Sequence, residues 1–554
     1  MSPIHNLRTS TLSDGNLVLT GVDGWDTNYA TQVIQGGKWY FEALEDGTDV
    51  SGPMVGVQDL DSDDKVDAHI GSGTDGWAVY FEPASGVSKY TNNTNVTLSL
   101  GTAASGGKAM IAVDADAGKI WFGYDGTWSG DPSAGTGEAY SGLPSDLKIG
   151  GGTSGSSPGS PVVRFGFGAA TLSSGGNADS NGYGDFEYTV PTGFLALCTA
   201  NQTALTFDPT DHVQNEVYTG SGATGKSVTQ SGNGSFTTQM AWIKSESQGS
   251  SGYNGYNVLV ADLIAMGEDV YNPLNGQNNL DSDVNSVESF DSGGITLGSL
   301  NMINNDGDTF RILMFGGAGA EATDETGTID SSVRVNTTAD FSFGTWTGSG
   351  AAATIGHGLS GPPDVILVSN LTNDSKARIY HSHAGNTKAL SMEEEPDGWQ
   401  TSTTYWNDTT PGGTTAGTFN VGSSSDTNGS GDTMFFFALK YVEGFSAGGG
   451  GDNPDSTDGP VYCTGGVPQY FQWSSISAQT QVLTNYDADE EYNDGARATT
   501  IFNAGDNAGF THDVDFNSNG VKIRHTSSTA DDHMWWAINR MPTVNKSETP
   551  AKAR

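Results

Sequence analysis

The stretch KAMIAVDADAGKIWFGYDGTW, residues 108–128, places two apolar runs on either side of DADAG. Asp and Gly favour a tight turn, and Gly118 can adopt a positive φ. Because apolar and aromatic residues fill both runs, we expect two antiparallel strands whose rings cover one sheet face against a second sheet. The stretch therefore predicts a hairpin in the core of a layered β fold.

Further strand patterns lie on both sides of this hairpin. They are KWYFEAL (38–44), MVGVQDL (54–60), WAVYFE (77–82) and VVRFGFG (162–168), each bounded by turn-forming residues. This region contains no convincing helical repeat. A row of strands without helices predicts an antiparallel β-sandwich.

The sequences GKWYFEAL, VGVQDLD, GWAVYF and AMIAVDADAGKIWFGYDGTWSGDPSAG resemble the SPRY domain, in the form found in structural proteins of tailed bacteriophages. The resemblance covers roughly residues 8–172. It implies a concanavalin-like sandwich that binds partners through loops at one end. The segment GYGDFEYTVPTGFLALCTAN (182–201) also resembles the segment that follows this domain in phage proteins, and we expect a connector docked on a neighbouring domain.

Internal similarity marks the rest of the chain. Three segments look like opening strands of a repeat: FTTQMAWIKS (236–245), PPDVILVSN (362–370) and VPQYFQWSS (467–475). Three others look like closing strands: DGDTFRILMF (306–315), SGDTMFFFAL (430–439) and ADDHMWWAI (530–538). The spacing of about 100–125 residues exceeds that of solenoid repeats, so we expect tandem β-rich domains. Over roughly 205–545 the pattern resembles an uncharacterised repeat domain common in marine phage virion proteins.

These patterns divide the chain into seven parts. GFSAGGGGDNPDSTDG (444–459) is glycine-rich and predicts a flexible linker. The predicted parts are a SPRY-like β-sandwich (1–175), a connector (176–204), repeat blocks at 205–335 and 336–446, a Gly/Asp-rich linker (447–459), a third block (460–545) and a flexible tail (546–554). NVLVADLIAM (257–266) fits either a short helix or a strand.

Charge and cysteine content restrict the partners. With 23 Lys and Arg against 65 Asp and Glu, the net charge is −42, which disfavours binding to nucleic acid and to anionic membranes. The two cysteines, Cys198 and Cys463, cannot form a disulfide framework or a structural zinc site, and they suggest assembly in a reducing compartment. We also expect no signal peptide and no membrane insertion, because no stretch of about 18 apolar residues occurs.

Two groups of residues are candidates for ligand binding. Aromatic residues expected at loop edges could stack on sugar rings or pack on a partner: Trp77, Trp128, Tyr140 and Trp406. No cofactor is expected, with calcium as the one candidate ion at the acidic stretch DLDSDDKVD, through Asp59, Asp61, Asp63 and Asp64. The alternative is a set of solvated turn aspartates. His381 and His383 could share a metal, or could be packing histidines.

The sequence contains no motif of a known catalytic class, and we expect a protein that is not an enzyme. The resemblances imply a phage virion structural protein, assembled in the host cytoplasm and located in the particle, as a tail fibre or tail-tip component. Its expected partners are other virion proteins, a host-surface glycan or protein, and further copies of itself in a homo-oligomer. The alternatives are a head decoration or head-fibre protein without a receptor, and a polysaccharide depolymerase.

Overall fold

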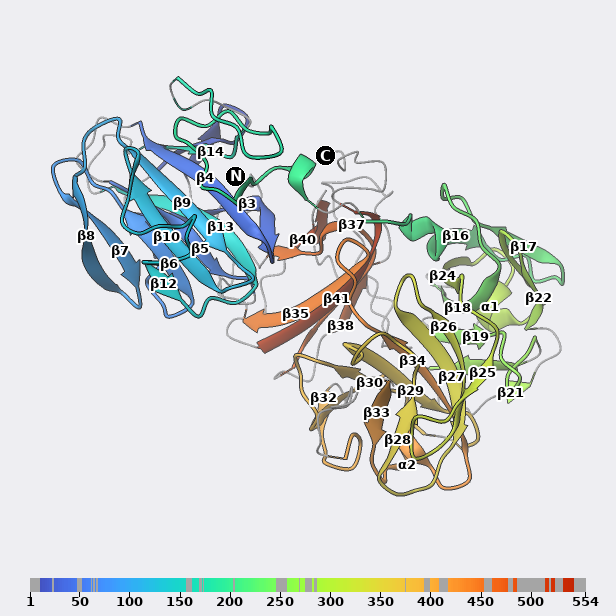
Figure 1. Cartoon of the computed structure of the whole chain (residues 1–554). Helices are drawn as coiled ribbons and strands as arrows, with labels where there is room; N and C mark the ends of the chain where they lie inside the picture. The colour runs from blue at the N-terminus through green and yellow to red at the C-terminus, as the bar shows by residue number, and fades with distance from the viewer. Residues whose placement is uncertain are drawn as a thin grey trace. The chain divides into compact units, whose positions relative to one another are not determined.

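The computed structural model divides the chain into two compact units (Figure 1). The first comprises residues 1–203, 452–463 and 526–529, and the second comprises 204–451, 464–525 and 530–554. The structure describes residues 10–21, 24–46, 52–60, 62, 65, 68–155, 162–168, 172, 174–202, 205–245, 257–268, 270–274, 281–282, 286–373, 375–392, 399–407, 417–452, 461–476, 482–485, 514–517, 520–523 and 532–542. The predicted tail at 546–554 lies outside these residues.

The first unit is an antiparallel β-sandwich, as predicted. One sheet has the order β1 (Thr11–Ser13), β2 (Val18–Thr20), β14 (Val162–Gly166), β4 (Lys38–Glu45), β9 (Lys108–Asp114), β10 (Lys119–Tyr124) and β11 (Thr127–Trp128), with β12 (Tyr140–Ser141) on β10 and β15 (Leu195–Ala196) on β4. The other has the order β3 (Gly24–Gln35), β13 (Asp146–Gly155), β5 (Pro53–Asp59), β6 (Gly76–Tyr80), β7 (Gly86–Thr91) and β8 (Thr94–Thr102). The short strand β36 (Val461–Cys463) also belongs to this unit.

The hairpin of β9 and β10 places its rings on both faces of its sheet. Gly118 has a φ of +61° in the turn, as expected. Phe122 packs in the core between the sheets, whereas Trp121 lies in a separate cluster on the opposite face with Phe186 and Phe194. The prediction places the rings on one sheet face with the alternate side chains facing outward; the alternation is confirmed, and Trp121 is one of the outward side chains.

The second unit contains three repeats, each built on a large sheet. Their orders are β16 (Val213–Thr219), β24 (Thr309–Gly316), β18 (Thr238–Ser245), β19 (Asn257–Ala261), β20 (Val270–Pro273) and β21 (Asp281–Ser282); β25 (Ala322–Asp324), β26 (Ser331–Asn336), β27 (Phe341–Thr347), β34 (Thr433–Leu439), β29 (Val365–Asn370), β30 (Arg378–His381), β31 (Lys388–Ser391) and β32 (Trp399–Thr401); and β35 (Ser446–Asp452), β41 (Asp532–Pro542), β37 (Gly466–Ser475) and β38 (Val482–Asn485). In each repeat the predicted closing strand lies beside the predicted opening strand: β24 lies between β16 and β18, β34 between β27 and β29, and β41 between β35 and β37.

Small sheets and short helical turns complete the repeats. The small sheets contain β17 (Lys226–Thr229), β23 (Gly294–Leu297) and β22 (Val287–Asp291) in the first repeat, β28 (Ala353–Gly356) and β33 (Thr418–Val421) in the second, and β40 (Gly520–Ile523) and β39 (Val514–Asn517) in the third. The helical turns are η1 (Thr199–Asn201), η2 (Pro209–Asp211), α1 (Asn301–Asn304) and α2 (Ser425–Asn428). The described part of the chain is thus all-β apart from these turns, and the predicted fold class is confirmed.

The predicted linker is wrong for residues 446–452. This glycine-rich segment forms β35, which occupies the same place in the third sheet as β16 and β27 occupy in theirs. A Cβ atom added to Gly448 would overlap the Tyr441 side chain and lie 2.7 Å from Trp535 O, so glycine allows close packing here. Residues 453–459 of the predicted linker lie outside the described part of the chain.

The three large sheets share one hydrophobic core. Its members include Phe315 of the first repeat, Phe437 of the second and Trp536 of the third. Hydrogen bonds repeat between successive copies: Asn272 Nδ2 donates to Ser369 Oγ (2.9 Å), and Trp399 Nε1 donates to Ser474 Oγ (3.0 Å). The two serines hold equivalent positions on β29 and β37. Val368, before Ser369, pairs with Phe436 of β34, and Trp473, before Ser474, pairs with the equivalent Trp535 of β41. The repeats therefore contact one another in a regular manner.

The first two repeats also share a buried asparagine before the closing strand. Asn304 accepts a hydrogen bond from Ser221 N (2.8 Å) and donates to Ala223 O and Gly298 O. Asn428 accepts from Ser349 N (3.0 Å) and donates to Ala351 O and Gly422 O. Both asparagines are completely buried, and both are fixed by a copy of the sequence TGSGA, at 219–223 and 347–351.

Candidate binding face

A cluster of four rings covers part of the outer face of the six-stranded sheet in the first unit. Trp25 lies on β3, Tyr80 on β6, Tyr90 on β7, and His69 in the loop before β6. The ring centroids are 4.8 Å apart for Trp25 and His69, 6.0 Å for Trp25 and Tyr80, 5.6 Å for His69 and Tyr90, and 5.8 Å for Tyr80 and Tyr90. We call these four residues the aromatic cluster.

The alternation of β6 explains how Tyr80 reaches this face. Trp77 and Val79 point to the core between the sheets, and Ala78 and Tyr80 point outward. The rings of the aromatic cluster other than His69 are half-buried, so each keeps an accessible surface. Outer sheet faces in water ordinarily carry polar side chains, and a patch of half-exposed rings is typical of a contact surface.

Polar groups surround the rings. The Tyr90 hydroxyl accepts a hydrogen bond from Asn95 Nδ2 (2.9 Å), and His69 Nδ1 lies 3.0 Å from Ile70 O. Burial, and then the nearby Glu82 carboxylate, raise the pKa of Tyr80 far above the usual range of a phenol. Tyr80 therefore stays neutral at physiological pH. The cluster combines apolar ring faces with hydrogen-bonding groups.

Lys65, which precedes His69 in the chain, is held by contacts to the sheet. Tyr29, which is completely buried, donates to Gln58 Oε1 (2.6 Å) and accepts from the Lys65 amide (2.9 Å). The Lys65 ammonium pairs with Asp75 at 2.7 Å. His69 itself is buried, with its ring centroid 4.8 Å from that of Trp25, so this part of the face is preformed, which lowers the entropic cost of binding.

Three of the predicted ligand-binding residues lie elsewhere in the same unit. Trp77 is half-buried and packs on the core of the sandwich. Tyr140 also packs on this core, with Lys89 Nζ 4.5 Å from its ring centroid, and burial raises its pKa to about 12. Trp128 packs beside Tyr40, with ring centroids 6.1 Å apart. The structure does not bring these three rings together with the aromatic cluster.

The fourth residue, Trp406, is not at an exposed loop edge as expected. Its side chain is completely buried in the core of the second repeat, and its Nε1 donates to Lys388 O (3.0 Å). Its ring meets Tyr380 edge to face at 5.8 Å. The surrounding Gly/Thr-rich sequence suggested a surface loop, but one apolar ring in such a segment can anchor it to the core.

The metal predictions fall partly outside the described residues. Asp59 ends β5, and Asp61, Asp63 and Asp64 lie outside the described part of the chain. His381 is buried and contacts Trp535 O and the Tyr441 hydroxyl, whereas His383 lies 2.9 Å from Asp532. Among the residues that the structure describes, no group of three or more His, Cys, Asp or Glu could hold a metal ion.

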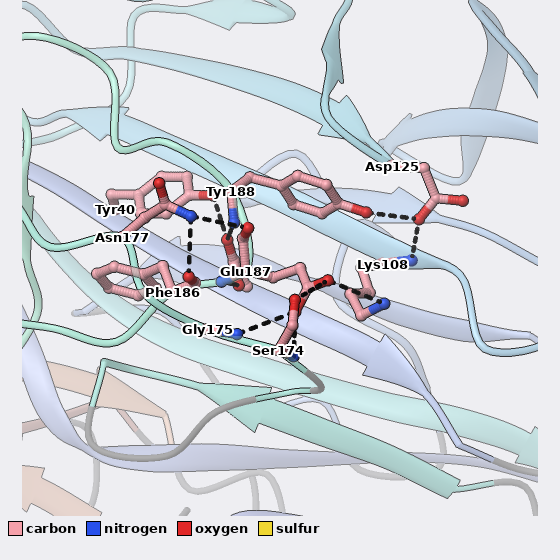
Figure 2. Close-up of polar contacts among 10 residues, drawn as sticks. Tyr40, Lys108, Asp125, Ser174, Gly175, Asn177, Phe186, Glu187 and Tyr188 are labelled. Atoms are coloured by element: carbon pink, nitrogen blue, oxygen red, sulfur yellow. Dashed lines mark hydrogen bonds and ion pairs between the residues drawn. The ribbon is translucent and has the colours of Figure 1, made fainter.

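The predicted connector docks on the sandwich around a buried carboxylate (Figure 2). Glu42 is completely buried and accepts hydrogen bonds from the Tyr40 hydroxyl (2.6 Å), Glu187 N (3.0 Å) and Tyr188 N (2.9 Å). The Tyr188 hydroxyl donates to Asp125 (3.2 Å). Figure 2 shows Glu187 and Tyr188 of the connector beside Tyr40 and Lys108 of the strands and Asp125, which follows β10. The three hydrogen bonds to Glu42 therefore fix the connector on the sandwich.

Cys198 packs against the cluster that contains Trp121 and Phe194, and neither Cys198 nor Cys463 forms a disulfide bond in the part of the chain that the structure describes. The longest helical segments described are single turns, and none has the length and hydrophobicity needed to cross a membrane.

Sequence reasoning did not select the aromatic cluster. Trp25 lies in GWDTNYATQVIQ, which has no regular apolar alternation, and Tyr90 lies in the polar stretch GVSKYT. The sequence WAVYFE does contain a signal for Tyr80. Side chains alternate between the two faces of a strand, so Tyr80 points to the face opposite to that of Trp77. The signal that could have found the site is therefore a ring on the solvent side of an alternating strand.

A domain of unknown function, DUF7483, matches residues 208–540. The chain therefore belongs to the DUF7483 family, whose match covers most of the second unit. Comparison with curated proteins found no match.

Solved SPRY domains are among the chain's structural neighbours. The SPRY domain of human HERC1 is 21% identical with a TM-score of 0.23, covering 28% of this chain and 92% of that one. The TRIM65 PSpry domain is 15% identical with a TM-score of 0.22, and the match covers 30% of this chain and 87% of the TRIM65 domain. Stonustoxin is 13% identical with a TM-score of 0.22, covering 29% of this chain and 27% of its own.

Proposed function

We propose that the protein is a structural component of a tailed-phage particle, a tail fibre or tail-tip protein, which attaches to a host-surface glycan through the aromatic cluster. The observation that carries the binding role is the set of half-exposed rings of Trp25, Tyr80 and Tyr90 on an outer sheet face. The phage assignment rests on the sequence resemblance alone.

The chemistry of the aromatic cluster suits a sugar. The apolar faces of pyranose rings stack on aromatic side chains, and the hydroxyl and amide groups of Tyr90 and Asn95 can bind sugar hydroxyls. Attachment of this kind is non-covalent, and many copies on one particle raise the overall affinity without new contacts. The net charge of −42 disfavours anionic surfaces, so a neutral glycan fits better than an acidic one.

The binding role is tested by alanine substitution in the full chain. We expect Trp25→Ala and Tyr80→Ala each to reduce binding to host cells, measured by flow cytometry of labelled protein, at least tenfold. The matched control is Tyr183→Ala, which removes an exposed aromatic ring of the same unit outside the cluster. Equal binding by all three variants and the wild type would reject the aromatic cluster as the attachment site.

The place in the particle is tested separately. Immunogold labelling of phage with an antibody to the first unit should mark the tail. Label on the head would favour a decoration role instead, and release of oligosaccharide from host polysaccharide would favour a depolymerase.

A further inference from the structure

A polar cleft of about 450 Å³ lies in the second unit, between the first and third repeats. This volume is within the range of small-ligand sites in proteins. Segments 208–216 and 231–233 of the first repeat form one side, and Gln469 with residues 540–542 of the third repeat forms the other. Nine of the thirteen lining residues have a polar side chain, so the cleft favours a polar ligand.

The walls of the cleft are held by their own hydrogen bonds. Gln214 is 2% exposed, donates to Thr210 O (2.7 Å) and Gly234 O (2.9 Å), and accepts from Gly232 N (2.8 Å). Gln469 is also 2% exposed and donates to Val213 O (3.1 Å) across the seam between the repeats. A ligand would therefore meet a preformed surface.

Three side chains at the cleft keep hydrogen-bonding capacity. Asp208 Oδ1 accepts from the Thr210 amide (3.0 Å) and hydroxyl (2.8 Å), but Asp208 Oδ2 makes no hydrogen bond within the described residues. The side chains of Ser231 and Asn233 are exposed and likewise make no hydrogen bond to any residue that the structure describes. The cleft thus offers one strong acceptor and two groups that both donate and accept.

The charges of the lining select the class of ligand. Asp208 and Glu216 outweigh the single cation Arg540, and the whole chain carries −42, so an anion is disfavoured. A simple cation would use the carboxylates but would give the Asn233 amide and the Ser231 hydroxyl no acceptor. Neutral hydroxyl groups can both donate and accept, and they match the mixed lining.

We propose that this cleft binds a short neutral oligosaccharide. One hydroxyl of the sugar donates to Asp208 Oδ2, and others exchange hydrogen bonds with Ser231 and Asn233. The site belongs to the second unit and does not depend on the aromatic cluster or on the phage assignment.

Isothermal titration calorimetry on the full chain tests the proposal. The probes are chitotriose and maltotriose as neutral sugars, trigalacturonate as an anion and trilysine as a cation. We expect saturable heat with at least one neutral sugar, and a Kd raised at least tenfold by Asp208→Asn and by Asn233→Ala. The control is Asp306→Asn, which makes the same charge change in an exposed turn of the same repeat and should keep the wild-type Kd.

Several outcomes would overturn the proposal. These are an absence of saturable heat with both neutral sugars, binding of trigalacturonate or trilysine alone, and an equal loss of affinity in the Asp306 control. Retention of sugar binding in Trp25→Ala would separate this cleft from the proposed attachment site.

Discussion

Replacing Gly448 by alanine tests whether the glycine-rich segment 446–452 is a packed strand. The backbone at Gly448 does not have a positive φ, so alanine is conformationally tolerated there and steric overlap alone determines the effect. The new methyl group would overlap the Tyr441 ring and lie 2.7 Å from Trp535 O, which is backbone and cannot move away easily.

The expected cost follows from these contacts. Overpacking of a close site costs about 1–3 kcal/mol. Displacing Tyr441 also breaks its hydrogen bond to His381 Nε2 (2.8 Å), which costs about 1 kcal/mol more. The sum of about 2–4 kcal/mol corresponds to a rise of roughly 30- to 1000-fold in local opening, since 1.4 kcal/mol is a factor of ten.

Hydrogen exchange of the full chain, read by mass spectrometry on peptides from β41, measures this opening directly. The matched control is Gly319→Ala, because a Cβ there meets nothing closer than Val335 O at 3.8 Å and the backbone is again compatible. Exchange in Gly448→Ala as slow as in the control would refute the packing argument and restore the linker interpretation.

Three further predictions concern buried polar groups. Asn428→Ala removes the partner of Ser349 N and should lower the free energy of unfolding of the second unit by about 2–4 kcal/mol in urea titrations. Burial lowers the pKa of His357 to about 4, below its ordinary 6.5, so its stabilising contribution is complete above pH 6.5 and falls by about 3 kcal/mol as the pH drops to 4. His357→Gln should abolish this part of the acid sensitivity, and parallel pH profiles of variant and wild type would contradict the reasoning. Glu42→Ala removes the acceptor of three donors, so exchange of the Tyr188 amide should accelerate by about 100-fold, whereas an unchanged rate would show that Glu42 does not hold the connector.

Much of the fold could be predicted because its strands alternate visibly. The predicted strands 38–44 and 119–124 match β4 and β10 to within one residue. Glycine-rich strands such as β13 and β35 escaped prediction, because glycine is typical of turns and linkers. At Gly151 an added Cβ would come within 2.7 Å of Phe165, so the missing side chain is what permits the sheets to pack.

The candidate sites were harder to predict than the fold. The ring at position 406 was expected to be exposed from its polar neighbours, yet the three-dimensional path of the chain buries it. The aromatic cluster joins Trp25, His69 and Tyr90 from separate segments, and their proximity depends on strand order, which periodicity does not specify. The acidic stretch after Asp59 stays a prediction.

The shared core of the second unit has a consequence for how its surface can change. In a trimer of identical subunits, one substitution would appear at every contact between subunits. Here each repeat has its own sequence, so a substitution changes one repeat only. The equivalent position already holds Lys244 in the first repeat and Ser369 and Ser474 in the other two, as the strand pairings align them. Because the three repeats belong to one chain, the contact between one pair of repeats can change its side chains while the other two contacts keep the architecture.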